Sequence, residues 1–167
     1  MVEEQRGNVG NESKNPYYEG KKYKEPTYCT RCGLVYHEGR WTDGDLTEDK
    51  KRKANKELCP ACRRERERVP EGLIYLNGSY LQDHGEEILN IARNRAETAA
   101  QTRPLQRIMW VNHEDGDEIE IATTSEHLAR RIGKAVRDAH DGELQIKSAQ
   151  NDRLVRVYWE RDFQKSG

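Results

Sequence analysis

The segments YCTRCGLVYHEGRW (residues 28–41) and LCPACRRERERVP (residues 58–70) contain all four cysteines of this 167-residue chain. They form two C-x2-C pairs separated by 26 residues. Such pairs serve as redox sites, as disulfides or as halves of one metal centre. Neither pair lies in the apolar strand-to-helix setting of a thioredoxin-like site. No stretch reaches about 20 apolar residues and the first residues have no signal-peptide pattern, so we expect a cytoplasmic protein, in which structural disulfides are rare.

The spacing favours a single structural Zn2+ bound by four thiolates. Two residues between cysteines allow both sulfurs of a pair to face one point, and two such knuckles complete a tetrahedron. Gly33 follows the first pair, where a knuckle requires a positive φ, and Pro60 suits a rigid turn within the second. Four sulfur ligands leave no position for water, so this zinc is not expected to be catalytic. The predicted ligands are Cys29, Cys32, Cys59 and Cys62.

His37 is a weaker ligand candidate. The pattern C-x2-C-x4-H belongs to a retroviral type of knuckle, which would require a cysteine at position 42, where this chain has Thr42. We therefore expect His37 to be a surface residue.

The cysteine module has too few apolar residues to fold unaided. Between the pairs, TDGDLTEDKKRKANKE (residues 42–57) has almost no apolar content, and we expect a loop there. Structural zinc contributes about 10 to 16 kcal/mol to the folding of finger peptides, which supplies the missing stabilisation. Trp41 is expected either to plug the space under the zinc or to stack on RNA.

The remainder of the chain predicts an α+β domain. Strands are expected at residues 72–78, 105–111, 118–124, 143–149 and 154–160, and helices at residues 79–103 and 125–141, with Ser79 and Ser125 as N-caps. The order βαββαββ is typical of a ferredoxin-like two-layer α/β sandwich with one added strand, and the last strand is a candidate exposed edge. The predicted organisation is a disordered tail (1–25), a zinc ribbon (26–69), the sandwich (70–162) and a short tail (163–167).

Charge is distributed unevenly along the chain. Residues 20–70 contain 14 Lys and Arg against 9 Asp and Glu, whereas residues 71–167 contain 13 against 17. A basic segment can follow a phosphate backbone, although it can also be an ordinary solvated surface. The candidate RNA-contacting residues are Arg40, Trp41, Lys50, Lys51, Arg52, Lys53, Lys56, Arg63 and Arg64. In RRERERVP (residues 63–70) the arginines alternate with Glu65 and Glu67, so internal ion pairs are an alternative there.

The motifs CTRCGLVYHEGRW, CPACRR and TTSEHLARRIGKAV resemble the nonsense-mediated-decay-protein-three family, whose members are zinc-binding adaptors of the large ribosomal subunit. The resemblance covers about residues 27–162 and suggests a short prokaryotic relative. It implies zinc ligation by the four cysteines and association with ribosomal RNA or the large subunit. The large members have more cysteine pairs, and the eukaryotic ones have transport-signal tails that this chain lacks, so export is not implied.

Three functions compete. The first is RNA binding through the zinc module, and the second is a protein–protein adaptor whose α+β half contacts a partner. The third is an enzyme, which we do not expect, because the acid–base residues occur in no recognised catalytic motif and the chain has no Gly-rich phosphate loop. These acid–base residues are His84, Glu86, Glu87, His113, Asp115, His127 and His140.

Overall fold

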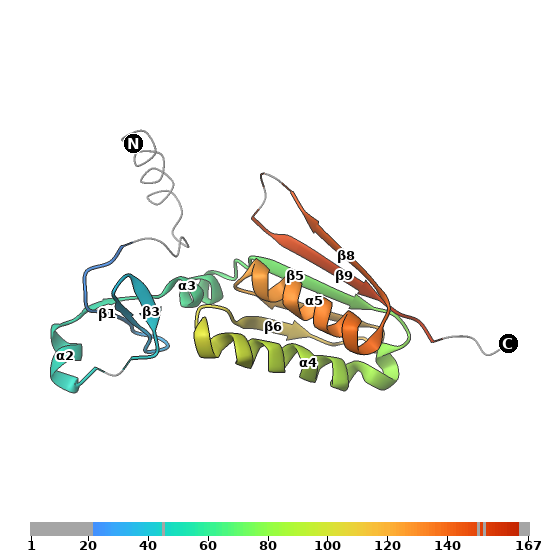
Figure 1. The fold of residues 1–167 in the computed structure, drawn as a ribbon, viewed down its shortest axis with the longest axis horizontal. Helices are drawn as coiled ribbons and strands as arrows, with labels where there is room; N and C mark the ends of the chain where they lie inside the picture. Colours follow the sequence, from blue (N-terminus) through green and yellow to red (C-terminus); the bar gives the residue numbers. More distant parts are fainter. Residues whose placement is uncertain (1–21, 45, 150, 152, 164–167) are drawn as a thin grey trace. The chain divides into compact units, whose positions relative to one another are not determined.

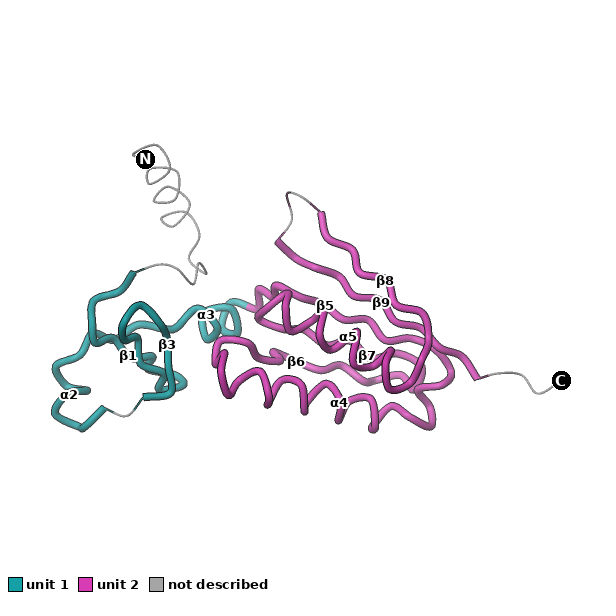
Figure 2. The backbone as a smooth tube through the Cα atoms, in the orientation of Figure 1, with its two compact units in different colours: residues 1–67 teal, residues 68–167 magenta. Residues whose placement is uncertain are grey.

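The computed structural model describes residues 22–44, 46–149, 151 and 153–163. The chain divides into two compact units, residues 1–67 and 68–167 (Figure 2). Most of the predicted N-terminal tail lies outside the described residues, as do residues 45, 150, 152 and 164–167. The α+β fold class predicted from the sequence is confirmed.

The first unit is a small sheet followed by a helix (Figure 1). Its strands are β1 (Thr27–Cys29), β2 (Val35–His37), β3 (Arg40–Thr42) and β4 (Asn55–Glu57), in the order β3-β2-β1-β4. β4 runs parallel to β1, and the other pairs are antiparallel. Helix α2 (Glu48–Lys53) and strand β4 occupy the segment expected to be a loop, so that expectation was wrong. Thr47 caps α2, because its hydroxyl accepts from the backbone N–H of Lys50.

An aromatic cluster forms most of the first unit's small core. Tyr23, Tyr36 and Trp41 meet edge to face, with ring centroids 5.0 to 5.5 Å apart. Trp41 is only 5% exposed, so its ring belongs to this aromatic core and is not a stacking face for RNA. This corrects its place among the candidate RNA contacts.

The second unit is a two-layer sandwich with both helices on one face of its sheet (Figure 1). In chain order its elements are β5 (Gly72–Asn77), α4 (Leu81–Thr102), β6 (Ile108–Asn112), β7 (Glu118–Thr123), α5 (Glu126–His140), β8 (Glu143–Ser148) and β9 (Val155–Glu160). The strands lie in the order β6-β7-β5-β9-β8.

A ferredoxin-like sheet is wholly antiparallel, whereas the sheet of this unit is mixed. β9 lies between β5 and β8 and runs parallel to β5, whereas in a purely ferredoxin-like order the strand after the second helix would take that place. Burial explains the exchange, since Val155, Val157 and Trp159 of β9 are at most 1% exposed. β8 forms one edge of the sheet, and its residues are at most half-buried, at alternate positions. The last strand, β9, is not an edge, so the expectation of an exposed last strand was wrong.

Alternating strand residues pack against one stripe of each helix. Ile74 and Leu76 of β5 alternate with half-buried neighbours. The stripe of α4 that packs on the sheet is buried and consists of Leu81, Ile88, Ala92 and Ala99. On α5 the apolar stripe ends before Ala139, which is exposed. Gly133 allows α5 to approach β9, because a Cβ there would lie 2.5 Å from Cγ1 of Val157.

The two predicted N-caps differ in outcome. The Ser125 hydroxyl accepts from the backbone N–H of His127, as predicted. Ser79 does not cap α4; its hydroxyl accepts from the backbone N–H of Phe163 instead. Gln82, three residues after Ser79, does not complete a capping box either, because its side chain donates to Asp117.

Candidate metal centre

The first cysteine pair lies at the turn between β1 and β2. Cys29 ends β1, and its backbone N–H donates to the carbonyl of Leu34 at 2.8 Å. The N–H of Gly33 closes the turn on the carbonyl of Cys29 at 2.9 Å. Gly33 has φ +84°, which confirms the prediction that this position needs a left-handed backbone.

The second pair lies at the start of a helix. Cys59 directly precedes α3 (Pro60–Glu67), and Cys62 lies in the first turn. Pro60 is the first helical residue, a position that suits proline because its missing N–H has no partner there in any case. This corrects the expectation of a second turn-like knuckle. The positive end of the helix dipole favours thiolates at this point, and the backbone N–H of Cys62 lies 3.4 Å from Sγ of Cys59.

The fold brings the four sulfurs together. All four lie within 4.8 Å of one another, and Sγ of Cys32 is 3.8 Å from Sγ of Cys59. Four sulfurs bonded at about 2.3 Å to one tetrahedral ion are about 3.8 Å apart, so the spacing fits a metal centre. Cys29, Cys59 and Cys62 are at most 1% exposed, and Cys32 is exposed. The four predicted ligands thus form a cluster able to hold a metal ion.

The pKa shifts of the clustered thiols also favour a bound cation. Hydrogen bonds with Cys32 and Cys59 hold the pKa of the Cys29 thiol far below its ordinary value. Hydrogen bonds with Cys29 and Cys32, together with burial, raise the pKa of Cys59. Each thiolate in this cluster makes the next one harder to form, and a bound divalent ion removes that repulsion. An all-sulfur donor set suits Zn2+.

Arg31 connects the two halves of the site outside the sulfur cluster. Its Nη1 donates to the carbonyl of Cys62 at 3.1 Å, and the same nitrogen lies 3.8 Å from the Glu65 carboxylate. The role of Arg31 cannot be predicted from the sequence, because only the fold brings the turn between β1 and β2 against α3.

His37 lies outside the sulfur cluster, as expected. Its side chain is 65% exposed, and its ring nitrogens lie 3.5 Å from the carboxylates of Glu25 and Glu38. The Glu25 carboxylate also accepts from the backbone N–H of Glu38 at 2.7 Å, so these groups form a surface network.

The structure divides the candidate RNA contacts into surface and interior residues. Arg64 is only 6% exposed and Arg63 is half-buried, which removes Arg64 from the accessible set and corrects that prediction. Among the other predicted RNA contacts, Lys51 is half-buried and the remaining basic side chains are exposed. These exposed residues are Arg40, Lys50, Arg52, Lys53 and Lys56.

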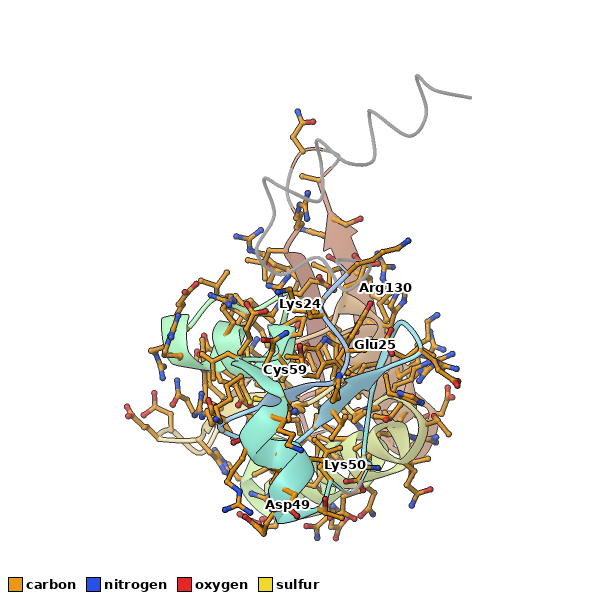
Figure 3. All side chains as sticks on the ribbon, turned by 90° about the vertical axis from the view of Figure 1, so that its left-hand side faces the viewer. Lys24, Glu25, Asp49, Lys50, Cys59 and Arg130 are labelled. Carbon is orange, nitrogen blue, oxygen red and sulfur yellow. The ribbon has the colours of Figure 1, made fainter. Side chains whose placement is uncertain are left out.

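Helix α2 places several of these cations beside a groove. Lys51 and Arg52 pair with Glu48 and Asp49 one turn earlier, whereas Lys50 and Lys53 form no ion pair within the described part of the chain. Both lysines line a groove of about 610 Å³, and Figure 3 shows Lys50 and Asp49 on α2. The groove is also lined by Pro26, Val35 and Leu46, with Glu25, His37, Thr42 and Gly44 completing it.

No described helix is long and apolar enough to span a membrane. Comparison of the chain with protein-family models, with curated proteins and with solved structures finds no match.

Proposed function

We propose that this protein binds RNA through its zinc-stabilised first unit, and that its target is ribosomal RNA or the large ribosomal subunit. The observation that carries the proposal is the groove beside α2, which combines an apolar lining with lysines that form no ion pair to any described residue. A nucleobase requires an apolar or aromatic surface, and its phosphates require cations within a few ångströms.

The charges around the groove support this proposal. Lys50 and Lys53 line the groove and Lys56 follows on β4, and none of the three forms an ion pair within the described residues. Glu25 is the acidic residue of the lining, and its carboxylate is already engaged by His37 and by the Glu38 N–H. The groove therefore keeps a cationic rim for a phosphate backbone.

The zinc has a structural role in this proposal. Four thiolates leave no coordination position for water, so the ion stiffens the unit that presents the lysines and supplies no Lewis acid. We propose that the protein is not an enzyme at this centre. The choice of the ribosome as target rests on the resemblance of the cysteine motifs and of residues 123–136 to the nonsense-mediated-decay-protein-three family. Binding to ribosomes also implies a cytoplasmic location.

The test is the salt dependence of binding to a labelled single-stranded RNA and to fragments of large-subunit RNA. Each phosphate contact contributes about 0.7 to the slope of log K against log salt for single strands, so replacing Lys50, Lys53 and Lys56 by Gln should reduce the slope by about 2. The zinc content should not change, because none of these residues contacts a sulfur ligand.

A matched control removes the same charge from the second unit. Arg130, Arg131 and Lys134 of α5 replaced by Gln should leave the slope within error of the wild-type value. If the control lowers the slope and the α2 variant does not, the RNA surface lies on α5 and the proposal fails.

A second candidate, a protein–protein adaptor, is favoured by the open face of the second unit's sheet. The two helices cover one face only (Figure 1). On the other face Tyr75 stacks on Tyr158 with ring centroids 5.3 Å apart. Half-buried aromatic residues are common where partners dock. Gradient sedimentation of lysate distinguishes the two functions: comigration with large subunits that is lost at high salt supports ribosome binding, whereas a light complex supports an adaptor.

A further inference from the structure

A second group of metal-ligating side chains lies in the second unit, far along the chain from the cysteines. His84 and Glu87 are one turn apart near the start of α4, and His140 is the last residue of α5. One ligand atom from each lies within 4.8 Å of the other two. The Oε2 atom of Glu87 is 3.2 Å from Nδ1 of His84 and 3.9 Å from Nε2 of His140.

Tyr80 orients both imidazole rings. Its own ring stacks on His84 with centroids 4.1 Å apart and planes 13° from parallel. Its hydroxyl lies 2.7 Å from Nδ1 of His140. When Nδ1–H of His140 donates to the Tyr80 oxygen, the lone pair of Nε2 is left on the side of Glu87. Metal-ligating histidines usually have such a partner on the second ring nitrogen, because it fixes the tautomer and the ring orientation.

The site is enclosed on one side and open on the other. The His140 side chain is 12% exposed, that of His84 is 32% exposed and that of Glu87 is 62% exposed. Burial lowers the pKa of His140. An ion can therefore enter past Glu87 and meet a preoriented imidazole.

The surrounding charges are mixed. His140 lies at the C-terminal, negative end of the α5 dipole, which favours a cation. Arg161 is the opposing charge: its guanidinium lies 4.0 Å from the centroid of the Tyr80 ring and donates to the carbonyl of His140. That contact directs one of its N–H groups to a backbone oxygen.

We propose that His84, Glu87 and His140 bind one divalent transition-metal ion, with Tyr80 as the positioning residue. Two imidazoles and a carboxylate suit Zn2+ and related first-row ions. Three protein ligands leave at least one coordination position for water or a small anion, so this site differs from the closed four-sulfur centre. The proposal is independent of RNA binding.

The experiment uses the full chain with one equivalent of Zn2+ already bound, titrated with Co2+. A second equivalent should bind and give visible d–d bands without the near-ultraviolet sulfur-to-cobalt charge-transfer band. Glu87→Gln and His140→Gln should abolish this second binding. Tyr80→Phe should weaken it by about 10 to 100-fold, the usual effect of losing an orienting partner.

The chain offers matched controls for both substitutions. Glu86→Gln changes the neighbouring exposed carboxylate, and His127→Gln changes an exposed histidine at the other end of α5; both should bind the second Co2+ with wild-type affinity. Retained chemical-shift dispersion in each variant excludes unfolding as the cause of a loss. The proposal is overturned if no second equivalent binds, or if binding survives Glu87→Gln and His140→Gln.

Discussion

The two units of this chain are stabilised in different ways. In the second unit, alternating residues on the central strands and one stripe on each helix form a continuous apolar core, with Ile74, Val157 and Ile132 fully buried. In the first unit the buried apolar residues are few, with Trp41 as the largest. A domain of ordinary composition can fold by burying apolar surface, whereas a polar unit of this size needs additional stabilisation such as the metal ion that we propose.

The largest expected effect is on the first unit alone. Chelation of the zinc, or Cys59→Ser, should unfold residues 22–67, because a structural zinc contributes about 10 to 16 kcal/mol in comparable peptides. Amide NMR spectra should lose dispersion for this unit and keep it for residues 68–163. His37→Gln is the control, since His37 is not a ligand and its replacement should change neither zinc content nor spectra. Loss of dispersion in both units would contradict the division into separately stabilised parts.

The next effect is the converse, a loss of stability in the second unit only. Ile132→Ala removes a fully buried side chain between α5 and the sheet, and should cost about 2 to 5 kcal/mol in the free energy of unfolding of this unit. Urea titration followed by the NMR signals of the second unit measures it. Arg131→Ala, at an exposed position beside it, should change stability by less than about 0.5 kcal/mol. The one equivalent of Zn2+ held by the cysteines should be retained in both variants, and its loss in Ile132→Ala would show that the units are coupled.

The smallest effect tests the two serines. Ser125→Ala should cost about 1 kcal/mol, because the capping bond to the His127 N–H is lost. Ser79→Ala leaves the N-terminus of α4 unchanged and removes two exposed hydrogen bonds, one from the Phe163 N–H and one to the Asp162 carboxylate, so a smaller loss is expected. Chemical denaturation of the paired variants compares them. Equal losses would indicate that Ser79 is a cap after all.

The sequence was sufficient where the signal is local. The cysteine spacing identified the four sulfurs that the fold brings together, Gly33 identified the left-handed turn, and Ser125 identified the start of α5. Periodicity also identified the order of elements in the second unit, because apolar stripes on helices and alternation on strands depend only on nearby residues.

The errors all arose where distant residues decide the outcome. β9 lies inside the sheet, between β5 and β8, because its buried face is more apolar than that of β8, and no single segment reveals this difference. Helix α2 has six residues and no buried side chain, so it carries no apolar period. His84 and Glu87 looked like scattered polar residues, because only the packing of α4 against α5 brings His140 to them.

The account depends most on four sulfurs binding one ion. Zinc-edge X-ray absorption of the protein loaded with one equivalent of Zn2+ tests this directly. We predict a single shell of four sulfur atoms at about 2.3 Å. A shell with nitrogen or oxygen ligands at about 2.0 to 2.2 Å, or a failure to retain one equivalent of zinc, would contradict it.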